Sequence, residues 1–103
     1  MAESRKVYLN GEFVSEQDAR ISIFDSAVMF GDMVFEMTRV YNHEPFRLRH
    51  HLERLYASLK VTEIDPGMSI DEMEKATLKT IEVNKECFPK GLDFQIMHKI
   101  GRA

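Results

Sequence analysis

The sequence has only one cysteine and no tryptophan in 103 residues. The thiol of Cys87 cannot form an intramolecular disulfide, and no cysteine–histidine cluster surrounds it at the spacing of a metal site. A reducing, cytoplasmic setting is therefore expected. No apolar run approaches the length of a membrane span, and residues 1–5 lack the apolar core of a signal peptide. These absences argue against a secreted, metal-binding or membrane-spanning protein.

An excess of positive charge is missing as well. The formal net charge is −3, which gives no electrostatic reason to bind nucleic acid or an acidic membrane surface. No glycine-rich phosphate-binding loop is present either. What is present is the composition of a globular domain, with 44% hydrophobic and 30% charged residues. The length suits one domain with one modest core.

Strand signals dominate the first half of the chain. Asn10-Gly11 lies between the β-favouring segments 7–9 and 12–14, and this arrangement predicts a hairpin, because both turn residues must accept positive φ. Residues 34–41 are rich in β-branched and aromatic side chains and predict a strand, which pairs weakly with 44–47 across a turn. Three shorter elements are also predicted: a strand at 21–24, a helix at 26–30 capped by Asp25, and a last strand over 92–100.

Helical spacing appears in the second half. One apolar stripe with offsets of four, seven, eight and eleven predicts a helix, and it comprises Leu48, Leu52, Leu55, Tyr56 and Leu59. Ser69 and Glu72 have the spacing of a capping box, which starts a second helix that runs to about Asn84. Strands, two helices and a final strand indicate an α+β fold, a small antiparallel sheet with both helices packed on one face.

Few residues carry chemistry by their spacing alone. His51 and Arg54 are three apart and share a helix face that could bind an anion, although a solvated basic face is the favoured interpretation. Glu36 and Arg39 have odd separation in a strand and should face opposite sides of the sheet. On these grounds the chain is only a soluble α+β domain.

Three segments, taken together, are more specific. Residues 7–14 (VYLNGEFV), 30–36 (FGDMVFE) and 46–55 (FRLRHHLERL) resemble, in order and spacing, the class IV or fold-type IV pyridoxal-phosphate-dependent aminotransferases. Residues 93–96 (DFQI) are similar to the strand that follows. The resemblance extends to branched-chain and D-amino-acid aminotransferases, and it implies that residues 1–103 form the N-terminal small domain of such an enzyme.

The resemblance also implies roles for individual residues. Arg54 matches the arginine that binds the phosphate of pyridoxal 5′-phosphate. Phe30 falls where family members often have a tyrosine lining the substrate pocket, so the hydroxyl is missing here. Arg102 falls near an arginine that binds the substrate carboxylate in D-amino-acid enzymes, but the usual Arg-Gly is replaced by Arg102-Ala103.

The family's Schiff-base lysine lies downstream, in a larger second domain. No lysine of this chain matches the Schiff-base lysine. The lysines of the chain are Lys6, Lys60, Lys75, Lys79, Lys85, Lys90 and Lys99. The chain is therefore expected to be truncated and inactive alone, with no catalytic residue of its own. The intact enzyme would be a homodimer that exchanges an amino group between a branched-chain or D-amino acid and a 2-oxo acid. Two alternatives stay open, an aminodeoxychorismate lyase on the same scaffold and a non-catalytic module that dimerises or binds an anion.

Overall fold

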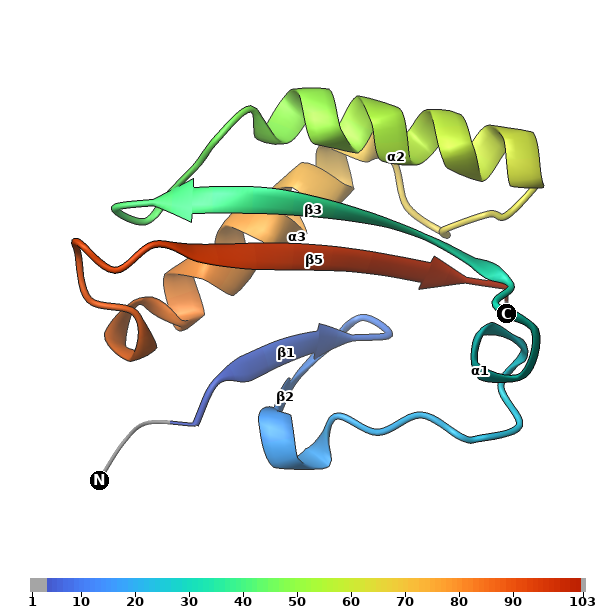
Figure 1. Ribbon diagram of the computed structural model, residues 1–103, viewed down its shortest axis with the longest axis horizontal. Helices are drawn as coiled ribbons and strands as arrows, with labels where there is room; N and C mark the ends of the chain where they lie inside the picture. Colours follow the sequence, from blue (N-terminus) through green and yellow to red (C-terminus); the bar gives the residue numbers. More distant parts are fainter. Residues whose placement is uncertain (1–3, 103) are drawn as a thin grey trace.

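The computed structural model describes residues 4–102, which form five strands and three α-helices (Figure 1). In chain order these are β1 (Lys6–Leu9), β2 (Glu12–Ser15), α1 (Ser26–Phe30), β3 (Met33–Tyr41), β4 (Glu44–Pro45), α2 (Leu48–Thr62), α3 (Ile70–Val83) and β5 (Phe94–Gly101), with short 3-10 turns at Glu16–Asp18 and Lys85–Cys87. Residues 1–3 and 103, which include part of the polar N-terminus and the alanine of the Arg102-Ala103 pair, lie outside the described residues. The predicted α+β class is confirmed.

The strands form two antiparallel sheets rather than the one expected. β1 pairs with β2, and the second sheet has the order β4-β3-β5. The predicted helix positions are confirmed, and α2 and α3 cover one face of β3 and β5 (Figure 1). Prediction of a single sheet failed because no hydrogen-bonded pairing joins β1 to β5 among residues 4–102.

The core follows the predicted stripe of α2. Four leucines of this stripe are buried and pack with Ile64 and Met73. These leucines are Leu48, Leu52, Leu55 and Leu59. Tyr56 lies at the edge of this cluster, where its hydroxyl donates to the carbonyl of Met68 at 2.8 Å. Each buried leucine contributes about 1.5–3 kcal/mol of hydrophobic free energy. The stripe therefore fixes which faces of α2 point inward and outward.

Both hairpins turn through residues with positive φ. Asn10 and Gly11 have φ of 50° and 87°, as the Asn-Gly signal predicts, and Leu9 pairs with Glu12 across them. The second turn uses Asn42 and His43 with φ of 49° and 67°. β4 is only two residues long and includes a proline, which agrees with the weak edge pairing expected.

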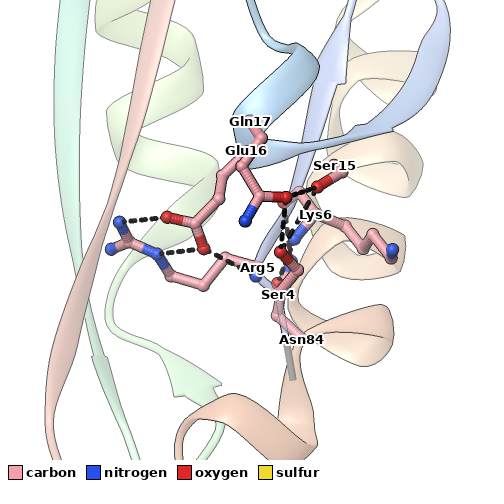
Figure 2. Close-up of polar contacts among 7 residues, drawn as sticks. All are labelled: Ser4, Arg5, Lys6, Ser15, Glu16, Gln17 and Asn84. Atoms are coloured by element: carbon pink, nitrogen blue, oxygen red, sulfur yellow. Dashed lines mark hydrogen bonds and ion pairs between the residues drawn. The ribbon is translucent and has the colours of Figure 1, made fainter. Parts of the chain in front are cut away.

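Among residues 4–102, the side chain of Asn84 at the end of α3 provides the hydrogen bonds between α3 and the β1–β2 hairpin (Figure 2). Its Oδ1 accepts from the Lys6 amide at 2.7 Å, and its Nδ2 donates to the Lys6 carbonyl at 3.0 Å. The same Nδ2 donates to the Thr80 carbonyl at 2.7 Å. At the base of the hairpin, Arg5 and Glu16 form a two-pronged ion pair. The hairpin therefore has a fixed position relative to α3.

One predicted element is wrong. Residues 21–24 form no strand, and their apolar side chains face solvent, with Ile23 and Phe24 being 71% and 77% exposed. A strand needs a neighbour to pair with, and this segment pairs with none of the described strands. The helix that follows is confirmed, because Asp25 accepts from the Ala27 amide at 2.9 Å and Gly31 ends it with φ of 69°.

Candidate functional site

Arg54 projects from the middle of α2 with 63% of its side chain exposed. Its one ion pair within residues 4–102 joins its Nε to Oε1 of Glu36 at 3.8 Å. No hydrogen bond involves its terminal guanidinium nitrogens in this part of the chain. Those nitrogens carry four planar N–H donors, the arrangement that matches phosphate or carboxylate oxygens. Arg54 is thus available to an anionic ligand.

Glu36 is the residue that orients this face of α2. It lies on the helix-covered face of β3, and only 12% of its side chain is exposed. Its Oε1 accepts a hydrogen bond from Nδ1 of His51 at 2.9 Å and also faces Arg54. His51 and Arg54 share a face as their spacing predicts, but a strand carboxylate, which sequence reasoning gave no role, is their common partner. The alternation of β3 was the only signal that could have placed Glu36 inward.

An open hollow of about 380 Å³ begins one helical turn beyond Arg54. Its lining is mostly apolar and consists of Val34, Ala57, Ser58, Val61 and Thr62. Small-ligand sites are commonly apolar with a few polar groups that fix orientation. An exposed guanidinium beside an apolar hollow can bind a ligand that carries an anionic group and an apolar body.

Arg102 follows β5 and bonds the carbonyl of Thr62, one of the residues that line this hollow, and α1 with Phe30 lies at the same end of the sheet (Figure 1). α1 packs beside the end of β5, where a Cβ built on Gly101 would lie 3.4 Å from the Ala27 Cβ. Phe30 is 78% exposed at the end of α1. Its exposed ring is free to line a site, but no ligand contact is defined by its surroundings, and its assignment stays a prediction.

Arg102 is held by protein groups. Its Nε and Nη2 donate to the two oxygens of Asp32 at 2.9 and 3.2 Å, and its terminal nitrogens donate to the carbonyls of Glu63 and Thr62 at 3.0 Å each. The Arg102 guanidinium holds the pKa of the Asp32 carboxyl below its ordinary value, chiefly by hydrogen bonding. Four of the five donors of Arg102 are therefore used, and its role toward a substrate carboxylate stays a prediction.

A buried histidine lies beside Glu36 and was missed from the sequence. His98 is the cross-strand partner of Glu36 and bonds Oγ1 of Thr77 through Nε2 at 2.8 Å. Its Nδ1 is buried and has no hydrogen-bond partner among residues 4–102. Burial lowers the pKa of His98, while the charge of Glu36 acts in the opposite direction. His98 is therefore a neutral interior group at neutral pH.

Other kinds of site find no support in the described part of the chain. Between residues 4 and 102, no group of at least three His, Cys, Asp or Glu side chains is placed to hold a metal ion. No helix in the same range is long and apolar enough to cross a membrane.

A known protein family matches the part of the chain that holds Glu36 and Arg54. A family described as amino-transferase class IV matches residues 33–100, about two thirds of the chain. The chain belongs to the class IV aminotransferase family. The matched range contains Glu36, His51, Arg54 and His98, but neither Phe30 nor Arg102.

Relatives of this class IV chain are known in archaea and bacteria. It is 46% identical over 79 residues to a putative branched-chain-amino-acid aminotransferase of Methanocaldococcus jannaschii, which covers 77% of this chain and 27% of that protein. It is 36% identical over 80 residues to D-alanine aminotransferase of Staphylococcus aureus, covering 78% of this chain and 28% of the relative. The chain thus spans less than a third of the length of these proteins.

Solved structures agree on the fold. A branched-chain aminotransferase of Thermoproteus uzoniensis, crystallised with norvaline, superposes with a TM-score of 0.80 at 32% identity, covering 92% of this chain and 32% of that one. The branched-chain amino acid aminotransferase of Escherichia coli gives a TM-score of 0.73 at 34% identity, covering 80% and 29%. Both the α+β fold and the family expected from the sequence are therefore confirmed.

Proposed function

We propose that this chain is the small domain of a pyridoxal-phosphate-dependent aminotransferase and that Arg54 binds the cofactor phosphate. The observation that carries the proposal is the exposed Arg54 guanidinium, whose Nε side faces Glu36 and whose terminal donors are unused, within the segment that matches the family. The residues fit the group, because a planar guanidinium suits phosphate oxygens and the adjoining hollow suits an aromatic ring.

The reaction we propose moves an amino group between an amino acid and a 2-oxo acid. When bound, pyridoxal phosphate supplies the carbonyl that carries the amino group and the electron-withdrawing ring. In this chain, Arg54 binds and orients the phosphate, and Glu36 with His51 keeps the arginine in place. Covalent attachment and proton transfer are assigned to polypeptide outside residues 1–103, so the chain alone is expected to be inactive.

The names of the relatives support a proposal for the substrate class. They are named for branched-chain amino acids and for D-alanine, which share an aliphatic side chain. We assign an aliphatic amino acid to the full-length protein, and we expect it to be cytoplasmic and to form a homodimer. The exposed aromatic ring of Phe30 is the group of this chain that we assign to the substrate pocket.

Replacement of Arg54 tests the phosphate assignment. A charge-assisted hydrogen bond contributes about 1.5–3 kcal/mol, so Arg54→Ala in the full-length protein should weaken pyridoxal-phosphate binding by roughly ten- to a hundredfold. Arg54→Lys should recover only part of this loss, because an ammonium group cannot make the planar pair. Cofactor affinity is measured by titrating the apoprotein and following absorbance.

Arg49→Ala is the matched control. Arg49 lies on the same helix but binds Asp71 at 2.7 Å and Glu74 at 3.4 Å, away from Glu36. It is exposed, so its loss should change stability little and cofactor affinity not at all. If the Arg54 and Arg49 variants bind the cofactor equally well, the assignment of Arg54 is wrong.

A further inference from the structure

The ends of α1, α2 and β5 meet at one end of the molecule (Figure 1), and the side chain of Arg102 joins them. Its Nε and Nη2 donate to the carboxylate of Asp32, which lies between α1 and β3, at 2.9 and 3.2 Å. Its Nη1 and Nη2 also donate to the carbonyls of Glu63 and Thr62 at the C-terminal end of α2, at 3.0 Å each. Arg102 therefore connects the loop after α1 to the end of α2.

α1 itself has little that could hold it in place. None of its five residues is buried, and a helix of this length is not stable in water without tertiary contacts. Within residues 4–102, the hydrogen bonds of residues 21–31 stay inside the segment that ends at Met33. Ala27 approaches Gly101, the residue before Arg102. The position of α1 therefore depends on what the flanking Asp32 binds.

Asp32 in turn ties both ends of α1 to this point. The hydroxyl of Ser26, the first residue of α1, donates to Oδ2 of Asp32 at 3.4 Å, and the Asp32 amide donates to the Ser26 carbonyl at 3.4 Å. Phe30, the last residue of α1, lies two positions before Asp32. Its ring is 78% exposed, so the backbone of α1 and not side-chain packing sets its location.

The surroundings of Arg102 favour an anchor over a substrate ligand. Four of its five N–H donors are used, and a guanidinium bonded in two directions has a fixed plane. The Thr62 carbonyl lies at the negative end of the α2 dipole, and the Asp32 carboxylate supplies a full negative charge. A substrate carboxylate would have to enter beside Asp32 against like-charge repulsion or displace it.

We propose that Arg102 is a positioning residue that holds Asp32, and through it α1 and the ring of Phe30, against the end of α2. It takes this role in place of the carboxylate contact expected from the sequence. Thr62, whose carbonyl Arg102 binds, also lines the apolar hollow that begins near Arg54. The inference deepens the proposed function and rests on the assignment of Phe30 to the substrate pocket.

A double-mutant cycle in the full-length protein tests this role. Arg102→Ala and Asp32→Ala should each raise KM for the amino acid roughly three- to tenfold, because apparent affinity falls with the fraction of molecules in which α1 is in place. kcat should fall less than KM rises, because bound substrate itself holds Phe30 in place. The double variant should be no worse than the more affected single variant, since both changes remove the same contact. Arg102→Lys should recover part of the loss.

Asp32→Ala separates anchoring from direct binding. If Arg102 bound the substrate carboxylate, loss of Asp32 would free its donors, so KM would stay the same or fall while Arg102→Ala still raised it. That pattern would overturn the proposal, as would an unchanged KM in both variants. Affinity for pyridoxal phosphate should be the same in wild type and variants, because Arg54 and Glu36 are untouched.

The order of α1 in the 103-residue chain gives a readout that needs no cofactor. NMR relaxation should give backbone order parameters of about 0.85 for residues 26–30 in the wild type and below about 0.6 in Arg102→Ala and Asp32→Ala. Equal order in the three chains would overturn the anchor even if the kinetic changes were found. A full-length protein that binds no pyridoxal phosphate would contradict the proposed function instead, and the order of α1 would still decide the role of Arg102.

Arg5→Ala is the matched control. Arg5 forms an ion pair of the same two-pronged kind with Glu16, at 3.2 and 3.1 Å, at the base of the β1–β2 hairpin. Its loss should change neither KM nor the order of α1. Persistent protection of the Leu52 and Leu55 amides from hydrogen exchange shows that each variant is folded. An equal loss of order in the Arg5 and Arg102 variants would overturn a specific role for Arg102.

Discussion

His98 shows how one residue can couple the stability of this domain to pH. Its imidazole is enclosed by β3, β5 and α3, and the ionisable groups nearest to it are Glu36 and His51. Burial lowers its pKa below the ordinary value of about 6.5, with Glu36 raising it and His51 lowering it by smaller amounts. The folded state therefore binds this proton less readily than the unfolded state does.

The sign of the pH dependence follows from that difference. A depressed histidine pKa contributes stability that is fully present above the unfolded pKa and is lost as pH falls below about 6.5. Urea denaturation should give a smaller free energy of unfolding near pH 5 than near pH 7.5. His98→Gln, which keeps an amide donor for Thr77 but cannot titrate, should lose less stability over the same interval. Equal losses in the two proteins would exclude His98 as the source.

For single residues, the sequence predicts which side chains can bind a ligand better than it predicts which residues those side chains contact. The spacing of His51 and Arg54 placed both on one helix face, and the family resemblance gave Arg54 a role. Glu36, which contacts both, lies 15 residues before His51 in the chain, and only the packing of α2 on β3 brings the two together at 2.9 Å. No local pattern carries that information.

Elements with local signals were predicted well. The capping box of α3 is complete, because Ser69 Oγ accepts from the Glu72 amide at 3.1 Å and the Glu72 carboxylate accepts from the Ser69 amide at 2.9 Å. The strand predicted at residues 21–24 does not form, because a strand needs a neighbouring strand to pair with. Their apolar side chains suggested a strand, yet nothing in the sequence shows which edge is available.

The attachment of the β1–β2 hairpin to α3 can be tested at a single position. Asn84 is buried and makes three hydrogen bonds, two of them to the Lys6 backbone. Asn84→Ala leaves those backbone groups without partners, which should cost about 1–3 kcal/mol in urea denaturation. Amide exchange of Lys6 and Tyr8 should accelerate more than that of α2.

Thr80→Ala is the matched control for this attachment. The Thr80 hydroxyl bonds only the Ala76 carbonyl within α3, and its own carbonyl still accepts from Asn84. The expected change is within about 0.5 kcal/mol. A loss as large as that of Asn84→Ala would mean that α3 itself, and not the hairpin contact, determines the stability.

The molecule as a whole is covered on one side only. α2 and α3 pack on the face of β3 and β5 that carries Val34, Val40 and Ile100, while the opposite face is open. The resemblance to a two-domain family implied that apolar residues such as Phe35 and Leu92 would be uncovered in this domain. They are 63% and 51% exposed. The separation of two sheets could not be predicted, because no local pattern shows that β1 and β5 are not paired with each other.

The open face predicts self-association of the chain. Phe35 and Met97 expose large apolar side chains there, at 63% and 42%, and apolar patches of this kind drive association in water. Burial of a phenylalanine contributes about 1.5–3 kcal/mol, so Phe35→Ser should raise the dissociation constant of the dimer roughly tenfold or more. Sedimentation equilibrium at several concentrations measures this constant.

Leu78→Ser is the matched control. Leu78 lies on α3, is 47% exposed and is away from that face, so its replacement should leave the dissociation constant unchanged. A wild-type chain that stays monomeric at high concentration would contradict the prediction, and an equal effect of the two substitutions would place the contact on a different surface.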